Sequence, residues 1–432
     1  MISIEQLYSI FLQHPVVSTD SRNCPSGALF FALKGEKFDG NDYIEQVLAD
    51  GAAYAVGDGV ALPDDERIIR VENVLQTLQD LANYHRKWMS ATIIAVTGSN
   101  GKTTTKELIA ATLASQYSTL YTQGNLNNHI GVPLTLLQLK PEHEFAVIEM
   151  GANHPGEIAA LCRIADPDCG LITNIGKAHL EGFGSLEGVI RAKTELYDYL
   201  RAKGGTVFAN LDNVILKVFF DSLPSLVGYG TASEAIIHGK ITASDPSLAL
   251  EWNDGRITTH LVGAYNFENV LAAICIANHF GVEKDKINAA IENYAPTNNR
   301  SQNLDTGRNH LIVDAYNANP SSMRVALENF NLLECSPKML ILGEMKELGE
   351  YSREEHQKLM DGLSPTLDKV FLVGKNYAEY SKDAACHVST KWKLFPTTDA
   401  LIEYLQSNPV KGYHILIKGS RSNQLERVIA YL

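Results

Sequence analysis

The residues best suited to do chemistry lie in one short stretch, GSNGKT, at residues 98–103. A short apolar run at residues 92–96 precedes it, and residues 106–116 carry apolar side chains at helical spacing. In a strand, glycine loop and helix of this kind, backbone N–H groups and the helix N-terminus attract an anion. Lys102 would reach the β- and γ-phosphates of a nucleotide, and the Thr103 hydroxyl would ligate Mg²⁺. The stretch therefore predicts a phosphate-binding loop.

The spacing of the two glycines departs from the usual phosphate-loop pattern, which places four residues between them. Here only Ser99 and Asn100 separate Gly98 from Gly101. On the spacing alone, an ordinary strand-to-helix turn followed by a chance Lys-Thr pair stays open as the alternative.

Two segments after the loop carry polar side chains that could meet a bound nucleotide. A predicted buried strand at residues 145–150 contains Glu149 near its carboxyl end, where a carboxylate beside a phosphate loop could ligate a metal. Asn125, Asn127 and Asn128 crowd a turn-rich segment. Turn chemistry explains asparagines in general, but three within four positions favour contact with a ligand.

His179 follows the third predicted strand, and Lys193 lies in the helix after it. Taken alone, His179 is best interpreted as a structural histidine. The corresponding interpretation of Lys193 is a surface lysine that pairs with Glu195 or Asp198. Neither residue is assigned to the nucleotide site unless other motifs support that assignment.

The amino-terminal segment, residues 1–88, contains Ser21, Arg22 and Lys34, which could hold a phosphate or a nucleotide. By themselves these residues are better explained as solvated loop residues.

The pattern of strands and helices indicates an α/β protein of three domains, at residues 1–88, 89–298 and 299–432. Segments 204–213 and 236–263 show short alternating strands, which predict antiparallel additions to the central domain. From residue 304 strands alternate with helices, which predicts an open and mainly parallel sheet. Three polar features lie at strand ends of this last domain: Asp314, Glu344 and the KGSR run at 418–421.

Composition narrows the function. A net charge of −13 argues against a nucleic-acid partner, because phosphate neutralisation needs a basic surface. Six scattered cysteines without a C-x-x-C pair indicate reduced thiols in a cytoplasmic protein. No apolar run reaches the roughly 18 residues of a membrane span, and the first residues lack the features of a signal peptide. We expect a cytoplasmic monomer.

Several motifs together resemble the Mur ligase superfamily, the ATP-dependent ligases that build the peptide of peptidoglycan. The shared features are TGSNGKTTTK, the strand-end Glu149, NIGKAHLEGFGS, AKTEL, YNFENVLAA, Arg300 and DAYNANPSSM. The short glycine spacing is that superfamily's own form, and the resemblance runs through all three domains. One departure is Tyr265-Asn266, where the superfamily commonly has His-Asn.

The resemblance implies a fold and an activity. The fold is a small α/β amino-terminal domain, a central P-loop ATPase-type domain with a mainly parallel sheet, and a carboxy-terminal Rossmann-like domain. The DSR…LFFALKGEKFDGNDY, GNLNNHIGVPLTLL, DAYNANPSSM and LGEMKELGEYSREEH segments look like the member that joins D-alanyl-D-alanine to UDP-N-acetylmuramoyl-tripeptide. Such a carbon–nitrogen ligase uses ATP and passes through an acyl phosphate.

The resemblance also implies roles for individual residues. For ATP it implies Gly98, Asn100, Gly101, Lys102, Thr103, Thr104, Asn266, Asn269, Arg300 and Asp314. For Mg²⁺ it implies Thr103, Glu149, His179 and Lys193, the last carbamylated by CO₂. For the UDP-muramyl-peptide it implies Ser21, Arg22, Lys34, Asn125 and Asn128. The expected catalytic residues are Lys102, His179 and Lys193.

Three alternatives stay open at this point. The related ligase that adds the third peptide residue has a similar amino-terminal block. A folylpolyglutamate-type ligase shares the ATP machinery, although its substrate domain has no reason to carry DSR…KGEKFDG. A P-loop nucleotide-binding protein without ligase activity is the third alternative.

Overall fold

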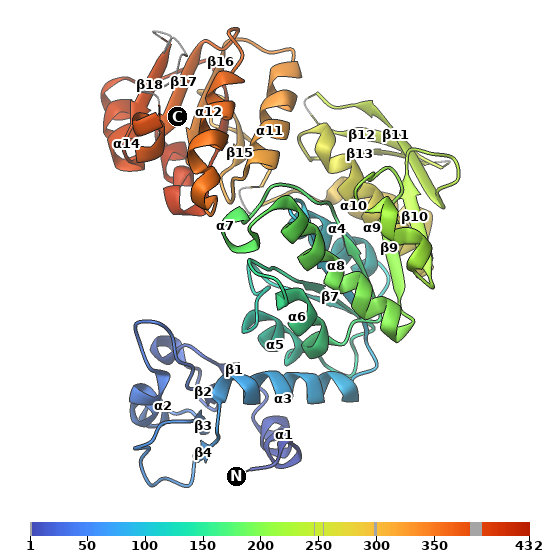
Figure 1. Ribbon diagram of the computed structural model, residues 1–432, viewed down its shortest axis with the longest axis vertical. Coiled ribbons are helices and arrows are strands. Elements are labelled where there is room, and N and C mark those ends of the chain that lie inside the picture. The colour runs from blue at the N-terminus through green and yellow to red at the C-terminus, as the bar shows by residue number, and fades with distance from the viewer. Residues whose placement is uncertain (1, 246, 254, 298–299, 381–390) are drawn as a thin grey trace.

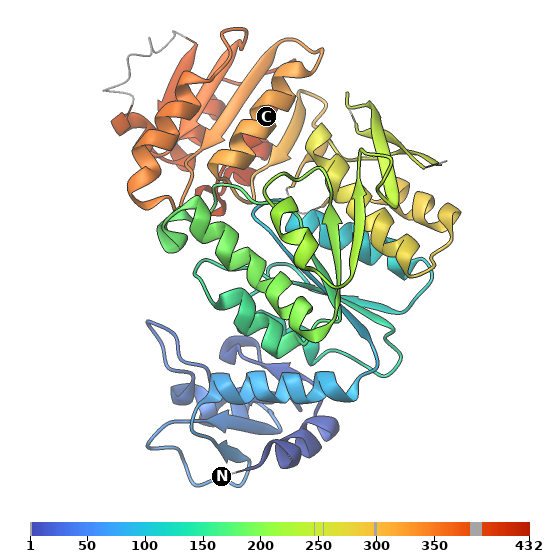
Figure 2. The same ribbon diagram turned by 45° about the vertical axis from the view of Figure 1, so that its right-hand side comes forward.

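The computed structural model describes residues 2–245, 247–253, 255–297, 300–380 and 391–432. Three sheets follow one another along the long axis of the molecule, each built from its own stretch of chain (Figures 1 and 2). The predicted three-part α/β architecture is therefore confirmed. The predicted boundary between residues 298 and 299 lies outside the described residues, and the boundary at 88 stays a prediction.

A four-stranded parallel sheet forms the amino-terminal part, coloured blue in Figure 1. Its strands are β1 (Val17–Ser18), β2 (Leu29–Phe31), β3 (Tyr54–Gly57) and β4 (Ile68–Arg70). Its helices are α1 (Ile4–Gln13), α2 (Ile44–Ala49) and α3 (Val74–Trp88). In α3 the buried side chains recur at helical spacing, which gives the helix one apolar face.

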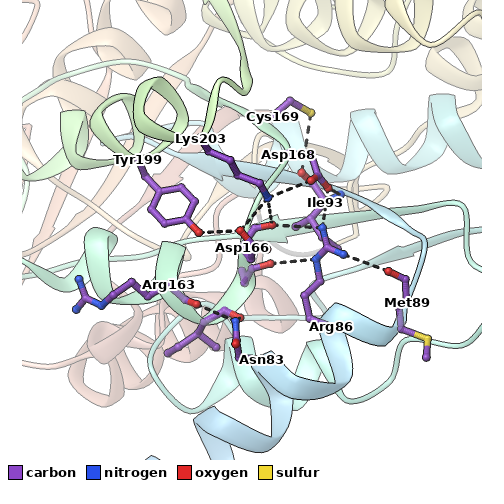
Figure 3. A network of polar contacts seen from close by, with 12 residues as sticks. Asn83, Arg86, Met89, Ile93, Arg163, Asp166, Asp168, Cys169, Tyr199 and Lys203 are labelled. Carbon is purple, nitrogen blue, oxygen red and sulfur yellow. Dashed lines mark hydrogen bonds and ion pairs between the residues drawn. The ribbon is translucent and has the colours of Figure 1, made fainter.

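The carboxyl-terminal half of α3 is fastened to the central domain by the polar network in Figure 3. Asp168 accepts hydrogen bonds from the Arg86 guanidinium (2.7 Å) and from the backbone N–H of Ile93 (2.9 Å). Lys203 Nζ lies 2.8 Å from Asp166 and 3.1 Å from Asp168. These contacts join α3 to the amino ends of two central strands, so the amino-terminal sheet is held against the central domain.

The central sheet has nine strands in the order β13-β12-β11-β10-β9-β8-β5-β7-β6. The strands are β5 (Thr92–Thr97), β6 (Thr119–Tyr121), β7 (Phe145–Glu149), β8 (Cys169–Ile172), β9 (Thr206–Asn210), β10 (Leu226–Gly230), β11 (Ile237–Ala243), β12 (Ala249–Trp252) and β13 (Gly255–Thr258). The helices are α4 (Lys102–Ala114), α5 (Gly131–Leu136), α6 (Glu157–Ala165), α7 (Leu180–Phe183), α8 (Leu186–Lys203), α9 (Phe267–His279) and α10 (Lys284–Asn293).

The predicted antiparallel additions are half right. β11, β12 and β13 pair antiparallel, as their alternating sequence predicts. The prediction is wrong for residues 204–213, because β9 pairs parallel with both β8 and β10. Four of its five residues are buried, since it lies inside the sheet with helices packed over it. A strand buried on both faces is typical of a parallel sheet.

The carboxy-terminal sheet has the order β14-β15-β19-β16-β17-β18, and every pairing except β14 with β15 is parallel. The strands are β14 (Gln302–Asp305), β15 (His310–Asp314), β16 (Lys338–Gly343), β17 (Lys369–Val373), β18 (Trp392–Phe395) and β19 (His414–Lys418). The helices are α11 (Pro320–Leu332), α12 (Ser352–Asp361), α13 (Lys375–Tyr380) and α14 (Thr398–Ser407). Asp314 and Lys418 end their strands and Glu344 follows β16, as predicted.

Two further expectations concern cysteines and membranes. All five cysteines in the described part of the chain are free thiols, and Cys386 lies outside it. Burial raises the pKa of the Cys162 thiol to about 12, which makes it unreactive. Among the described helices, none is long and apolar enough to span a bilayer.

Candidate active site

The phosphate loop leaves the carboxyl end of β5, between its neighbours β8 and β7. Gly98 has φ +144° and Gly101 has φ +78°, conformations that favour glycine. A Cβ on Gly98 would lie 2.0 Å from Thr173 Oγ1, and one on Gly101 would lie 2.6 Å from Asn269 Oδ1. Both glycines are therefore required by backbone conformation and by close neighbours, which supports the short form of the loop.

The residues after β8 hold the phosphate loop from the side. Asn174 Oδ1 accepts from the Asn100 N–H (3.0 Å), and Thr173 Oγ1 donates to the Asn100 carbonyl (2.6 Å). Ser99 Oγ donates to the Gly176 carbonyl at 3.1 Å. The loop backbone is thus fixed by groups of the central domain.

Lys102 begins α4, and its ammonium donates to the Gly98 carbonyl at 2.8 Å. Burial lowers the pKa of Lys102, while the nearby Glu149 carboxylate opposes that shift and Arg300 adds to it. A cation held among other charges at a helix N-terminus is suited to an anionic ligand.

A cavity of about 670 Å³ opens beside the loop, between the central and carboxy-terminal domains. The sequence-predicted residues that line it are Asn100, Gly101, Lys102, Thr103, Thr104, Asn125, Asn128, Glu149, His179, Asn266, Asn269, Arg300 and Asp314. The structure therefore brings most predicted residues of the two domains to one place, although they span more than 200 positions of the chain.

Glu149 ends β7 and is only 1 % exposed. Its Oε1 accepts from Asn127 Nδ2 at 2.7 Å. Its Oε2 is buried and has no hydrogen-bond partner among the described residues. A buried carboxylate oxygen without a partner is costly unless a cation or donor meets it.

These donors suit a Mg²⁺ ion, which takes oxygen ligands and is usually bound through one or two carboxylates, waters and phosphates. Glu149 Oε2 and the Thr103 hydroxyl are such oxygens, and both residues line the cavity. In the described chain, no group of three or more His, Cys, Asp and Glu side chains could hold a metal alone. The protein by itself would therefore supply only part of a magnesium shell.

His179 also lines the cavity, from a turn where its φ is +52°. Its Nδ1 lies 2.5 Å from a carboxylate oxygen of Glu347, which belongs to the carboxy-terminal domain. The histidine lowers the pKa of the Glu347 carboxyl through this contact. His179 is thus held at the junction of the two domains.

Lys193 is 1 % exposed, so its interpretation as a surface lysine is wrong. The suggested partners are engaged elsewhere, since Glu195 accepts from the Gly156 N–H (2.6 Å) and Asp198 from Arg201 (2.5 Å). Burial first, and then the charge of Lys102, lower the pKa of Lys193 to about 7. Lys193 is therefore a buried amine whose surroundings favour the neutral form, and it does not line the cavity.

Asn266 and Asn269 are buried, and their side chains bond one another, Asn269 Nδ2 to Asn266 Oδ1 at 3.0 Å. Asn269 Oδ1 also accepts from Thr105 Oγ1 at 3.0 Å, which joins α9 to the helix of the phosphate loop. Tyr265, at the position that departs from the superfamily, bonds Ser301 at 2.7 Å.

Arg300 and Asp314 reach the cavity from the carboxy-terminal side. The Arg300 guanidinium lies 3.7 Å from the centre of the Tyr316 ring, and its Nε is buried without a partner among the described residues. The Asp314 carboxylate pairs with Lys418, whose side chain is 2 % exposed.

Ser21, Arg22 and Lys34 lie in the amino-terminal domain, outside the lining of this cavity. Arg22 is exposed and bonds Asp20 twice, from Nε and NH2, at 2.9 Å each. Lys34 pairs with Asp58 at 3.0 Å. The structure therefore keeps these residues apart from the phosphate loop.

Sequence reasoning missed three residues of the site: Asn174, Tyr316 and Asn319. Asn127, one of the three asparagines that the sequence favours for contact with a ligand, lines the cavity and bonds Glu149, a partner that the sequence does not indicate. Asn174 is the second polar residue after β8, a position that often contacts ligands in parallel sheets.

Three family models match the chain. The Mur ligase family catalytic domain matches residues 15–86, the Mur ligase middle domain matches 96–277, and the Mur ligase glutamate ligase domain matches 299–421. The chain belongs to the Mur ligase family.

Individual relatives of this Mur ligase are similar over almost their whole length. The chain is 34% identical to UDP-N-acetylmuramoyl-tripeptide–D-alanyl-D-alanine ligase of Bacillus subtilis, over 96% of this chain and 92% of the relative. It is 36% identical to the Escherichia coli ligase of the same name, over 96% and 93%. A MurF ligase from Thermotoga maritima, solved in complex with ADP, superposes with a TM-score of 0.84 at 30% identity, covering 97% of both chains.

Proposed function

We propose that this Mur ligase joins D-alanyl-D-alanine to UDP-N-acetylmuramoyl-tripeptide with ATP, in the synthesis of peptidoglycan precursors. The observation that carries the proposal is the shared cavity, where the phosphate loop, Glu149 and the carboxy-terminal Arg300 and Asp314 face one another. Relatives that carry the name of this activity are similar over the full chain, which favours it over the ligase for the third peptide residue.

The reaction has two steps. A carboxylate oxygen of the tripeptide attacks the γ-phosphorus of ATP, the bond to the bridging oxygen breaks, and ADP leaves. The amine of D-alanyl-D-alanine then attacks the acyl carbon of the acyl phosphate, the C–O bond breaks, inorganic phosphate leaves, and the amine loses a proton. The amide bond thus forms with phosphate as leaving group in place of hydroxide.

The chain's own residues would act mainly by binding and positioning charge. The backbone N–H groups of the phosphate loop and the Lys102 ammonium would hold the ATP phosphates. Arg300 would reach the phosphates from the opposite side, since it lines the cavity, its Nε has no partner among the described residues, and its guanidinium lies 3.7 Å from the centre of the Tyr316 ring. Asn266 and Asn269 would approach the adenine, and Asp314 the ribose.

Mg²⁺ would be held by Thr103, Glu149 and His179, together with phosphate oxygens. When bound, the ion neutralises charge that develops on the transferred phosphoryl group. The buried Glu149 Oε2 supports this assignment, because it lacks any other partner in the described chain.

Lys193 would carry a carbamate, formed when its neutral amine adds to CO₂ and loses a proton. The support is its burial and a pKa lowered to about 7, since carbamylation needs the neutral amine. Its nearest hydrogen-bond acceptor in the described chain is the Ala152 carbonyl at 3.4 Å. A carbamate there would supply the anionic oxygen ligand that the metal site is short of.

The remaining assignments follow from the same proposal. Ser21, Arg22 and Lys34 would bind the UDP group, and Asn125 and Asn128 would face the muramyl-peptide. The substrate domain would occupy residues 1–88, the ATP domain 89–298 and the third domain 299–432. We also propose that the protein is a cytoplasmic monomer.

Phosphate release tests the proposal. With ATP, Mg²⁺ and UDP-N-acetylmuramoyl-tripeptide, D-alanyl-D-alanine should stimulate release and form a pentapeptide product, whereas single amino acids should not. If the enzyme instead prefers UDP-N-acetylmuramoyl-dipeptide together with a single amino acid, the ligase that adds the third peptide residue is favoured. Absence of phosphate release with any such pair would favour a nucleotide-binding protein without ligase activity.

A further inference from the structure

Among the described residues, one hydrogen bond connects the carboxy-terminal domain directly to the phosphate loop. Asn319 Nδ2 donates to Asn100 Oδ1 at 2.7 Å. Asn319 is 6 % exposed and is the N-cap of α11, because its Oδ1 accepts from the Ser322 N–H at 2.9 Å. The amide oxygen of Asn319 therefore caps its own helix, and the amide nitrogen bonds to the central domain.

The backbone of Asn100 does not depend on this contact. Its N–H and carbonyl are already bonded to Asn174 and Thr173 of the central domain. Among the described residues, Asn319 is the only hydrogen-bond partner of the Asn100 side chain. That side chain is thus the part of the loop that the carboxy-terminal domain contacts through a hydrogen bond.

A second hydrogen bond holds the amino end of α11 against the central domain. Ser321 Oγ accepts from the Lys177 N–H at 3.0 Å, in the loop that leads to His179. A Cβ on Gly176 would lie 2.8 Å from Ser321 Oγ, so the two chains approach closely there. Lys177 Nζ also pairs with the buried Glu355 at 2.7 Å. The start of α11 therefore docks on two of the loops that border the cavity, the phosphate loop and the loop that leads to His179.

We infer that Asn319 is a positioning residue that couples docking of the carboxy-terminal domain to the phosphate loop, an inference that rests on the proposed ligase function. The cavity is complete only when this domain is docked, since it supplies Arg300 and Asp314. Loss of the bond leaves the buried Asn319 amide and the partly buried Asn100 acceptor without each other in the docked arrangement. Docking then becomes less favourable, while each domain keeps its own fold.

Asn319→Ser is the test variant, because serine is a good N-cap but is too short to reach Asn100. We expect kcat for phosphate release to fall by about tenfold, a typical size for coupling between sites. The KM for UDP-N-acetylmuramoyl-tripeptide should stay within about twofold and Tm should not change, since the amino-terminal domain and the cap of α11 are untouched. An unchanged kcat would overturn the inference.

Thr397→Ala is the matched control, because Thr397 caps α14 of the same domain, accepting from the Ala400 N–H at 3.2 Å. Figure 1 shows α14 on the side of that domain away from the central one. This variant should lower Tm and leave kcat unchanged. If Thr397→Ala lowers kcat as much as Asn319→Ser, general loosening of the domain explains both and the inference fails.

A double-mutant cycle with Asn100→Ser tests the contact itself. If the two side chains act through their bond, the double variant should be no slower than the slower single variant. If the two single substitutions lower kcat by factors that multiply in the double variant, the two side chains act independently and the inference is overturned. If the unmodified enzyme releases no phosphate with these substrates, the proposed function fails instead, which separates the two outcomes.

Discussion

Asn127 Nδ2 donates to Glu149 Oε1 at 2.7 Å, and this bond holds the carboxylate so that Oε2 stays buried without a partner in the described chain. Thr122 completes the arrangement, since its Oγ1 accepts from the Glu149 N–H at 3.0 Å. The proposed metal ligand is therefore oriented by a residue that need not touch the metal.

Asn127→Ala should raise the Mg²⁺ concentration needed for half-maximal activity by about tenfold, because residues that orient a metal ligand typically contribute that much to affinity. The measurement is phosphate release as a function of Mg²⁺ at saturating ATP. Asn125→Ala, from the same turn, is the control and should not change the Mg²⁺ requirement. Equal requirements in the Asn127 variant and the unmodified enzyme would contradict the orienting role.

Lys102→Ala should reduce ligation by roughly 10²–10³ or more, because it removes a charge from the phosphates of the transition state. The fold should persist, since in the described part of the chain the ammonium bonds only carbonyls of its own loop, Gly98 at 2.8 Å and Ser99 at 3.3 Å. Turnover and circular dichroism check both statements. Near-normal turnover in a folded variant would end the interpretation as an ATP-dependent ligase.

Lys193→Ala should nearly eliminate activity, and acetate or another small carboxylate should partly restore it by replacing the carbamate oxygens. A second readout does not depend on activity. After incubation with ¹³C-labelled bicarbonate, the unmodified protein should show the ¹³C signal of a carbamate, and the variant should lack it. A fully active alanine variant without this signal difference would refute the role of Lys193.

Arg22→Ala should weaken binding of the UDP-muramyl-peptide by about tenfold, the effect of losing one charged hydrogen-bond donor to a diphosphate. ATP affinity should not change, because Arg22 lies in the amino-terminal domain and does not line the ATP cavity. Calorimetric titration of both ligands decides the matter. If the variant loses the same affinity for both ligands, Arg22 contributes to folding and not to binding of the UDP-muramyl-peptide.

The unfolding free energy should fall as pH drops below about 6.5, the ordinary histidine pKa, partly because of His85. This residue is 4 % exposed between Tyr8 OH (3.1 Å) and the Leu139 carbonyl (2.9 Å). Burial lowers the pKa of His85 in the folded state, so the unfolded chain binds the proton more readily. Acid therefore favours unfolding, down to the folded-state pKa.

Thermal unfolding between about pH 7.5 and 5.5, on either side of the ordinary histidine pKa, measures how the stability changes with pH. His85→Gln should be less stable at the upper pH, because it loses the ring contacts, and its Tm should fall less steeply with acid. Parallel curves for the two proteins would show that His85 does not contribute to the pH dependence.

Local patterns in the sequence determined the three-part α/β fold, the phosphate loop and the strand-end positions of Glu149 and Asp314. These features depend on periodicity and on neighbours a few residues away, which any reader of the chain can inspect. The prediction failed at β9 because pairing direction depends on which strands lie beside it, and both lie parallel to it.

Only the tertiary structure decided that Lys193 is buried, that Asn127 orients Glu149 and that Asn319 reaches Asn100, 219 positions earlier in the chain. The helix pattern around Lys193 equally suits a solvated face, and the packing of α8 on the sheet, α6 and α7 removes the side chain from water. A site that two domains share exists only where they dock, and docking depends on side chains that no local pattern relates to one another.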